Sequence, residues 1–138
     1  MIVVDTNIIG YLYLSSERSG QAEKALLKDA EWTAPILWRS ELRNVLAQYL
    51  RRGILSFEDV VRIMDEATRL MTGREYEIAS MDVLRLVRGS RCSAYDCEFV
   101  ALARNLNVPL VTVDKQVLRE FPTDAISLDE FTGNGSGG

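Results

Sequence analysis

"MIVVDTN" (1–7) opens the chain, and its apolar residues run directly into a carboxylate at Asp5. The first four residues are typical of a short buried strand. A carboxylate in the next position can cap the following helix, or it can hold something positive. The rest of the sequence has to distinguish between these two roles.

Short apolar strands alternate with amphipathic helices along the rest of the chain. Strands are predicted at 1–4, 31–35, 108–113 and 125–128, and 75–80 is a weak strand or an extended linker. Helices are predicted at 7–14, 20–30, 37–52, 56–71, 80–87, 93–107 and 115–121. Near-continuous apolar strands separated by helices indicate an α/β fold with a parallel sheet. The helices at 37–52 and 56–71 are predicted to form a helical hairpin inserted between two strands.

Composition limits the classes of function. A chain of 138 residues fits one domain, expected at 1–131, followed by a flexible Gly/Ser-rich tail at 132–138. Histidine is absent, which removes the commonest general base and every catalytic triad that needs an imidazole. The two cysteines are too few for a disulfide scaffold or a zinc site. No signal peptide or membrane span is recognised, so a reduced, cytoplasmic location is expected.

Four acidic residues stand where the predicted fold should gather them. Asp5 and Asp114 each follow a predicted strand, and ligands of parallel α/β sheets bind beyond the carboxyl ends of the strands. Glu41 and Asp96 lie on or beside the apolar faces of two helices. A carboxylate directed towards a core is costly unless it is paired or binds a cation.

Each acid also has a purely structural interpretation. Asp5 and Asp114 could be helix N-caps, Asp96 could complete a capping box with Ser93, and Glu41 could pair with an arginine. Together the four favour a site for a divalent cation, because neighbouring carboxylates repel one another. Oxygen ligands select Mg²⁺ or Mn²⁺, and such an ion can activate water against a phosphodiester bond.

Four stretches carry a resemblance to a known family. These are "VVDTN" (3–7), "LWRSELRNVL" (37–46), "SAYDCEFVALA" (93–103) and "PLVTVDKQVL" (109–118). In this order the chain resembles a PIN domain, and most of all the VapC-type toxins of toxin–antitoxin pairs. The resemblance covers the chain from Ile2 to about Phe131.

The resemblance implies a fold and an activity. The fold is a three-layer α/β/α arrangement with a mainly parallel sheet in the order 3-2-1-4-5. The activity is that of an Mg²⁺- or Mn²⁺-dependent endoribonuclease that hydrolyses RNA with metal-activated water, as the toxin of a type II pair. The implied catalytic and metal-binding residues are Asp5, Glu41, Asp96 and Asp114, with Thr6, Asn7 and Thr112 in support. The implied partners are RNA, a small antitoxin and a second copy of the chain.

The net charge of −4 leaves RNA to be held by a local group of cations. Arg39, Arg43, Arg91 and Lys115 flank the predicted acids and are the candidate RNA contacts, although each one taken separately is more typical of a solvated surface charge. Glu98 adjoins Asp96 but is expected to point off that helix face, and solvent exposure is favoured over a role as an outer-shell acid.

Two other functions stay open: an RNA-processing nuclease of the same fold without an antitoxin, and a non-catalytic binding module. A receiver domain and a haloacid-dehalogenase phosphatase fit worse, because each needs acidic residues at strand ends that this chain lacks.

Overall fold

The computed structural model describes residues 1–133, which fold around one five-stranded sheet. The strands are β1 (Ile2–Val4), β2 (Trp32–Pro35), β3 (Glu75–Tyr76), β4 (Leu110–Thr112) and β5 (Ala125–Ser127). Their order is β3-β2-β1-β4-β5, and every neighbouring pair is parallel. The predicted α/β class and strand order are confirmed. Of the predicted tail at 132–138, residues 134–138 lie outside the described part of the chain.

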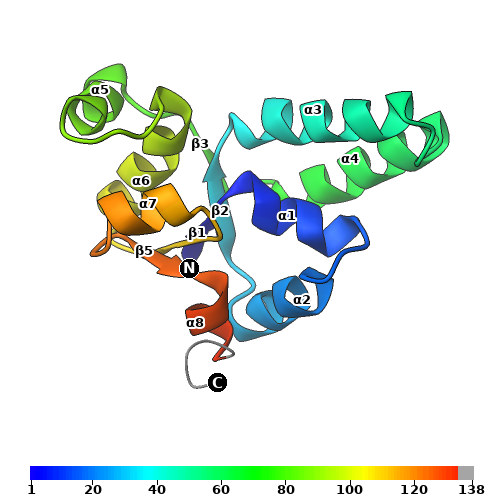
Figure 1. Cartoon of the computed structure of the whole chain (residues 1–138), viewed down its shortest axis with the longest axis horizontal. Coiled ribbons are helices and arrows are strands. Elements are labelled where there is room, and N and C mark those ends of the chain that lie inside the picture. Colours follow the sequence, from blue (N-terminus) through cyan, green and yellow to red (C-terminus); the bar gives the residue numbers. More distant parts are fainter. Residues whose placement is uncertain (134–138) are drawn as a thin grey trace.

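Helices cover both faces of the sheet and give three layers (Figure 1). One face carries α5 (Ser80–Arg88), α6 (Ala94–Leu106) and α7 (Lys115–Glu120). The other side carries α1 (Thr6–Tyr13), α2 (Ser19–Lys28), α3 (Trp38–Arg51), α4 (Phe57–Met71) and the short α8 (Leu128–Thr132). Helices α3 and α4 lie side by side as the predicted hairpin between β2 and β3 and extend away from the sheet. None of the helices within residues 1–133 is long and apolar enough to cross a membrane.

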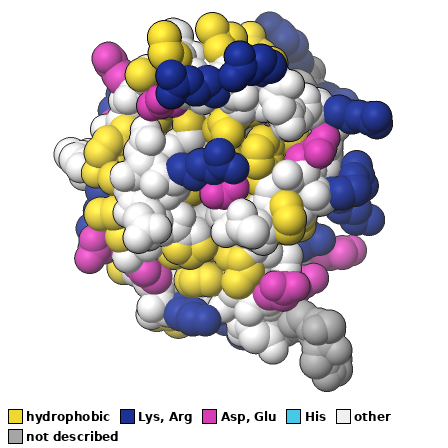
Figure 2. All heavy atoms as spheres, turned by 90° about the vertical axis from the view of Figure 1, so that its left-hand side faces the viewer, with side chains coloured by type: hydrophobic (Ala, Val, Ile, Leu, Met, Phe, Trp, Pro, Cys, Tyr) yellow, Lys and Arg dark blue, Asp and Glu magenta, His cyan; other side chains and the backbone are white. Residues whose placement is uncertain are grey.

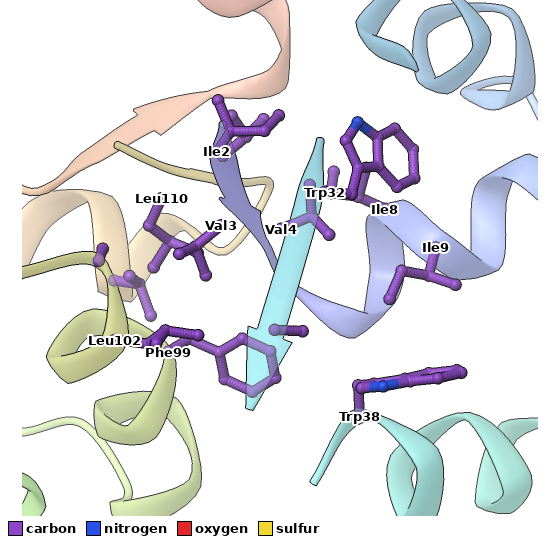
Figure 3. Packing of buried hydrophobic residues seen from close by; sticks show 14 of the residues in the cluster. Ile2, Val3, Val4, Ile8, Ile9, Trp32, Trp38, Phe99, Leu102 and Leu110 are labelled. Carbon is purple, nitrogen blue, oxygen red and sulfur yellow. The ribbon is translucent and has the colours of Figure 1, made fainter. Parts of the chain in front are cut away.

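The core explains why the central strand β1 is wholly apolar. All three residues of β1 are buried, because β1 lies at the centre of the sheet with helices on both sides. Phe99 and Leu102 of α6 approach it from one side, and Ile9 of α1 and Trp38 of α3 pack on the other (Figure 3). A central strand enclosed in this way holds the residue that follows it in a fixed place.

One element was not predicted. Residues 128–132 form helix α8, which starts after Ser127 and packs beside α2. The Ser127 hydroxyl accepts a hydrogen bond from the amide of Glu130 at 3.1 Å, so the cap is of the usual kind. Five residues are too few to show a helical period, which is why the pattern of apolar residues did not indicate this helix.

Candidate functional site

The predicted acids meet at the carboxyl edge of the sheet. Asp5 follows β1 directly and Asp114 lies two residues after β4, while Glu41 and Asp96 come from the first turns of α3 and α6. All four line one pocket of about 270 Å³, which has room for a hydrated ion and a phosphate group. The other lining residues are Thr6, Asn7, Asn44, Val45, Phe99, Leu110, Thr112 and Val117.

Asp5 and Asp114 are helix caps as well as pocket residues. Asp5 Oδ1 accepts the amide N–H of Ile8 at 3.1 Å, and Asp114 Oδ1 accepts that of Val117 at 3.0 Å. Each cap fixes one carboxylate oxygen on the backbone of the following helix. The prediction that these two residues are helix N-caps is therefore confirmed. The same two side chains also line the pocket.

Two threonines orient the acids. The hydroxyl of Thr112 donates to Asp5 Oδ2 and accepts the amide N–H of Asp114 at 3.0 Å, so it links the two strand-end acids. The hydroxyl of Thr6 donates to Glu41 Oε1 at 2.6 Å. Both threonines are buried, which keeps these contacts away from competing water. The predicted supporting roles of Thr6 and Thr112 have a hydrogen-bonding basis, and Asn7 lines the pocket mouth as an exposed residue.

Burial and mutual repulsion raise the pKa values in this pocket. Burial raises the pKa of Asp5 to about 6, with the Asp114 charge adding to the effect and hydrogen bonds from Thr112 and the backbone opposing it. Burial also raises the pKa of Asp96, with help from Asp114, and that of Glu41, with help from Asp96. Across residues 1–133, none of these four carboxylates forms a salt bridge. The pocket thus holds negative charge that the protein leaves unneutralised.

The donor set suits a hydrated divalent ion. In the part of the chain that the structure describes, no three acidic or thiol side chains are placed to chelate one ion directly. Mg²⁺ does not need such a cage, because it usually keeps several waters and takes one or two carboxylates. Oxygen ligands alone, with no histidine or cysteine lining the pocket, fit Mg²⁺ or Mn²⁺ better than zinc. The assignment of all four acids as metal ligands stays a prediction.

Replacement of Asp5 by asparagine is expected to stabilise the metal-free protein at alkaline pH. The carboxyl group titrates near 3.8 when unfolded and near 6 when folded, so its contribution to stability falls as pH rises between these values. Removing the charge should raise the free energy of unfolding by about 3 kcal/mol at pH 8. The loss of one of the two hydrogen bonds that Asp5 accepts should lower it by about 1 kcal/mol. The net gain of about 2 kcal/mol should vanish near pH 4. Urea unfolding in EDTA at both pH values measures it, and a loss of stability at pH 8 would mean that Asp5 serves only as a cap.

The predicted RNA contacts differ in their surroundings. Arg39 is paired with Glu75 of β3, whereas Arg43, Arg91 and Lys115 are exposed and form no salt bridge among the described residues. The loop of Arg91 is held against α7, since its amide donates to the Glu120 carboxylate at 2.9 Å. Arg43, Arg91 and Lys115 therefore remain free to meet an anion.

One residue of the pocket was not anticipated, and one acid near it is less exposed than expected. Asn44 lies one turn after Glu41 and lines the pocket, a position that the helical period alone would have indicated. Glu98 is half-buried rather than exposed, and burial, followed by the charge of Glu41, raises its pKa. Full solvent exposure, the favoured prediction for Glu98, was wrong, and a place as an outer-shell acid stays a prediction.

A known protein family matches most of the chain. The profile of the PIN domain matches residues 2–122. The chain belongs to the PIN domain family. A relative of this PIN domain is ribonuclease VapC3 of Pyrobaculum aerophilum, which is 31% identical over 124 residues, covering 88% of this chain and 95% of VapC3.

Solved structures share the fold of this PIN domain. The crystal structure of PAE2754 from Pyrobaculum aerophilum superposes with a TM-score of 0.75 at 20% identity, over 96% of this chain and 93% of that one. FitAcB from Neisseria gonorrhoeae superposes with a TM-score of 0.68 at 17% identity, over 93% of this chain and 98% of that one. A structure of FitAB bound to a DNA fragment gives the same TM-score at 18% identity. At these identities the likeness establishes the fold.

Proposed function

We propose that this PIN domain is an Mg²⁺- or Mn²⁺-dependent endoribonuclease. One observation carries the proposal: four carboxylates from four different elements line a single pocket that no side-chain cation neutralises within residues 1–133. The family membership and the likeness to ribonuclease VapC3 support it. The presence of all four acidic residues in the pocket also argues against a non-catalytic binding module.

The residues of the pocket have distinct parts in the proposed reaction. Asp96 and Asp114, whose charges face each other, are the proposed ligands of the ion, with Asp5 and Glu41 acting directly or through bound water. Thr112 and Thr6 hold Asp5 Oδ2 and Glu41 Oε1 in place. A bound Mg²⁺ or Mn²⁺ would lower the pKa of a water ligand and polarise the phosphodiester. The test is the cutting of generic RNA by the purified protein in Mg²⁺ or Mn²⁺ and its arrest by EDTA.

We infer a toxin role from the relatives. VapC3 is a relative by sequence, and FitAcB and FitAB share the fold. The proposed partners are a short antitoxin that occupies the acidic pocket and a second copy of this chain. An RNA-processing nuclease without an antitoxin has the same pocket chemistry. A neighbouring reading frame for a short protein with a DNA-binding N-terminal half would favour the toxin role. Its absence would favour the RNA-processing nuclease.

The RNA is proposed to lie along free cations beside the pocket. Figure 2 shows the face that carries α5, where Lys and Arg side chains gather along one edge while acidic side chains are scattered. Arg85 and Arg88 lie in the last turn of α5, and Arg91 follows in the next loop. An uneven distribution of this kind lets a protein of net charge −4 attract a polyanion locally.

Replacement of both Arg91 and Lys115 by glutamine is expected to raise the KM for RNA and leave kcat nearly unchanged. Each lost contact with a single-strand phosphate should lower the slope of log affinity against log salt by about 0.7, so the double variant should lose about 1.4. The same two-charge change at Arg51 and Arg52, at the far end of α3, is the matched control. Steady-state kinetics over a salt series measure both variants, and equal slopes for the two would contradict the proposed path.

A further inference from the structure

Helix α3 carries Glu41 in its first turn, yet the start of this helix has no local cap. The N-cap position is Leu37, whose backbone is already helical and whose side chain forms no capping hydrogen bond. The first N–H groups of a helix have no partner within the helix, and a cap usually fixes them. The Arg39 N–H donates to the Ile36 carbonyl at 3.1 Å, but no side chain caps the turn that presents Glu41 to the pocket.

A carboxylate on the neighbouring strand holds this turn. Glu75 Oε2 accepts hydrogen bonds from Trp38 Nε1 at 2.8 Å and from Arg39 Nε at 2.5 Å, and Glu75 Oε1 accepts from Arg39 Nη2 at 2.6 Å. Trp38 is fully buried, and the Glu75 side chain is only 13% exposed. The bidentate ion pair with Arg39 holds the pKa of Glu75 below its usual value. We name these three residues, Trp38, Arg39 and Glu75, the clasp.

The clasp is well placed to act on Glu41. Trp38 and Arg39 are the first two residues of α3, and Glu41 follows Trp38 by three residues, or about 4.5 Å along the axis. On the other side, β3 is a two-residue edge strand that pairs with β2, so Glu75 stands on the sheet itself. The clasp thus ties the Glu41 turn to the frame that also carries Asp5.

We propose that Glu75 is a positioning residue for the acidic pocket, acting on Glu41 through Trp38 and Arg39. This inference rests on the proposed metal-dependent nuclease function. It assigns Arg39 to the clasp instead of to RNA. The Nε and Nη2 groups of its guanidinium already donate to Glu75, so this edge is not available to a phosphate. A small displacement of a group that sets reaction geometry can reduce a rate by up to roughly a hundredfold.

A second ion pair in the same protein provides a matched control. Arg104 Nε donates to Asp124 Oδ1 and Arg104 Nη2 donates to Asp124 Oδ2, both at 3.0 Å. The Asp124 side chain is 13% exposed, the same as Glu75, and the Arg104 side chain is 50% exposed against 36% for Arg39. Neither Arg104 nor Asp124 lines the acidic pocket. Breaking this pair should remove a similar interaction without touching the turn that carries Glu41.

The experiment compares Glu75→Gln with Asp124→Asn in the full chain. Mn²⁺ binding to the protein alone is followed by electron paramagnetic resonance, together with kcat and KM for RNA and the melting temperature. Glu75→Gln should weaken Mn²⁺ binding by roughly tenfold or more and lower kcat, with the KM for RNA unchanged. Asp124→Asn should lower the melting temperature by a similar amount and leave Mn²⁺ binding as in the unchanged chain.

Arg39 variants supply the second line of the test. Arg39→Ala should reproduce the effect of Glu75→Gln on Mn²⁺ binding, and the double variant should be no worse than either single one, because both remove the same clasp. Arg39→Lys keeps one charged donor and should bind Mn²⁺ with intermediate affinity. An Arg39→Ala protein with a raised KM and normal Mn²⁺ binding would instead make Arg39 an RNA contact and overturn the proposal.

Equal Mn²⁺ affinities for Glu75→Gln and Asp124→Asn would also overturn it, since the clasp would then contribute only stability. If the unchanged chain binds Mn²⁺ but cuts no RNA, the nuclease proposal is contradicted and the positioning role of Glu75 is not. The Mn²⁺ affinities of the variants would still decide the part played by Glu75.

Discussion

Replacement of Asp96 by asparagine is expected to abolish RNA cutting. Asp96 is half-buried in the pocket, faces the charge of Asp114 and has no cation partner among the described residues, so an ion is its natural counter-charge. Asparagine keeps the shape and removes the charge. Outer-shell changes at metal sites cost about 10- to 100-fold in activity, and the loss of a proposed direct ligand should exceed roughly a hundredfold in kcat. Asp5→Asn should be as inactive, despite its gain in stability.

The chain offers a close control for Asp96. Asp82 is the third residue of α5, as Asp96 is the third residue of α6, and both are half-buried, but Asp82 does not line the acidic pocket. Asp82→Asn should cut RNA at the rate of the unchanged chain. Steady-state cleavage of a labelled RNA compares the variants, and an active Asp96→Asn protein would rule out the proposed role of the pocket.

Removal of divalent ions is expected to have an equally large effect. With EDTA in excess, the four acids repel one another without compensation, and RNA cutting should fall to background. Mg²⁺ or Mn²⁺ added back beyond the chelator should restore it. Binding to the folded state alone also raises stability, so either ion should raise the melting temperature of the unchanged chain.

The same melting measurement tests where the ion binds. In Asp96→Asn the rise in melting temperature with Mn²⁺ should be much smaller, because one proposed ligand is missing. Cutting that continues in EDTA would show that the activity needs no metal. An equal rise in both proteins would place the ion at another site.

The position of the acids followed from the sequence because local rules determine it. A wholly apolar strand followed by Asp5 predicts a carboxylate at the edge of a parallel sheet, and Asp114 follows the mainly apolar stretch of β4 and Val113 in a similar way. Glu41 and Asp96 were found because a charged residue beside an apolar helical stripe breaks the period. The order of the strands came from the family resemblance, since hydrophobic patterns do not show which strands are neighbours.

The supports of the acids depend on distant contacts that no local pattern shows. Glu75 reaches Trp38 and Arg39 across 36 or 37 residues of sequence, and Thr112 reaches Asp5 across 107. Such pairs depend on strand register and on helix placement, which the fold alone decides. For this reason Arg39 was predicted as an RNA contact, while the structure gives it a carboxylate partner.

The most direct test of the central claim is the chemistry of the product ends. RNA is incubated in Mg²⁺ with the unchanged chain and, in parallel, with Asp96→Asn, and the ends of the fragments are identified. Hydrolysis by a metal-activated water predicts 5′-phosphate and 3′-hydroxyl ends from the unchanged chain and no fragments from the variant. Fragments with 2′,3′-cyclic phosphates, or equal cutting by both proteins, would contradict a metal-dependent nuclease built on the acids around Asp5.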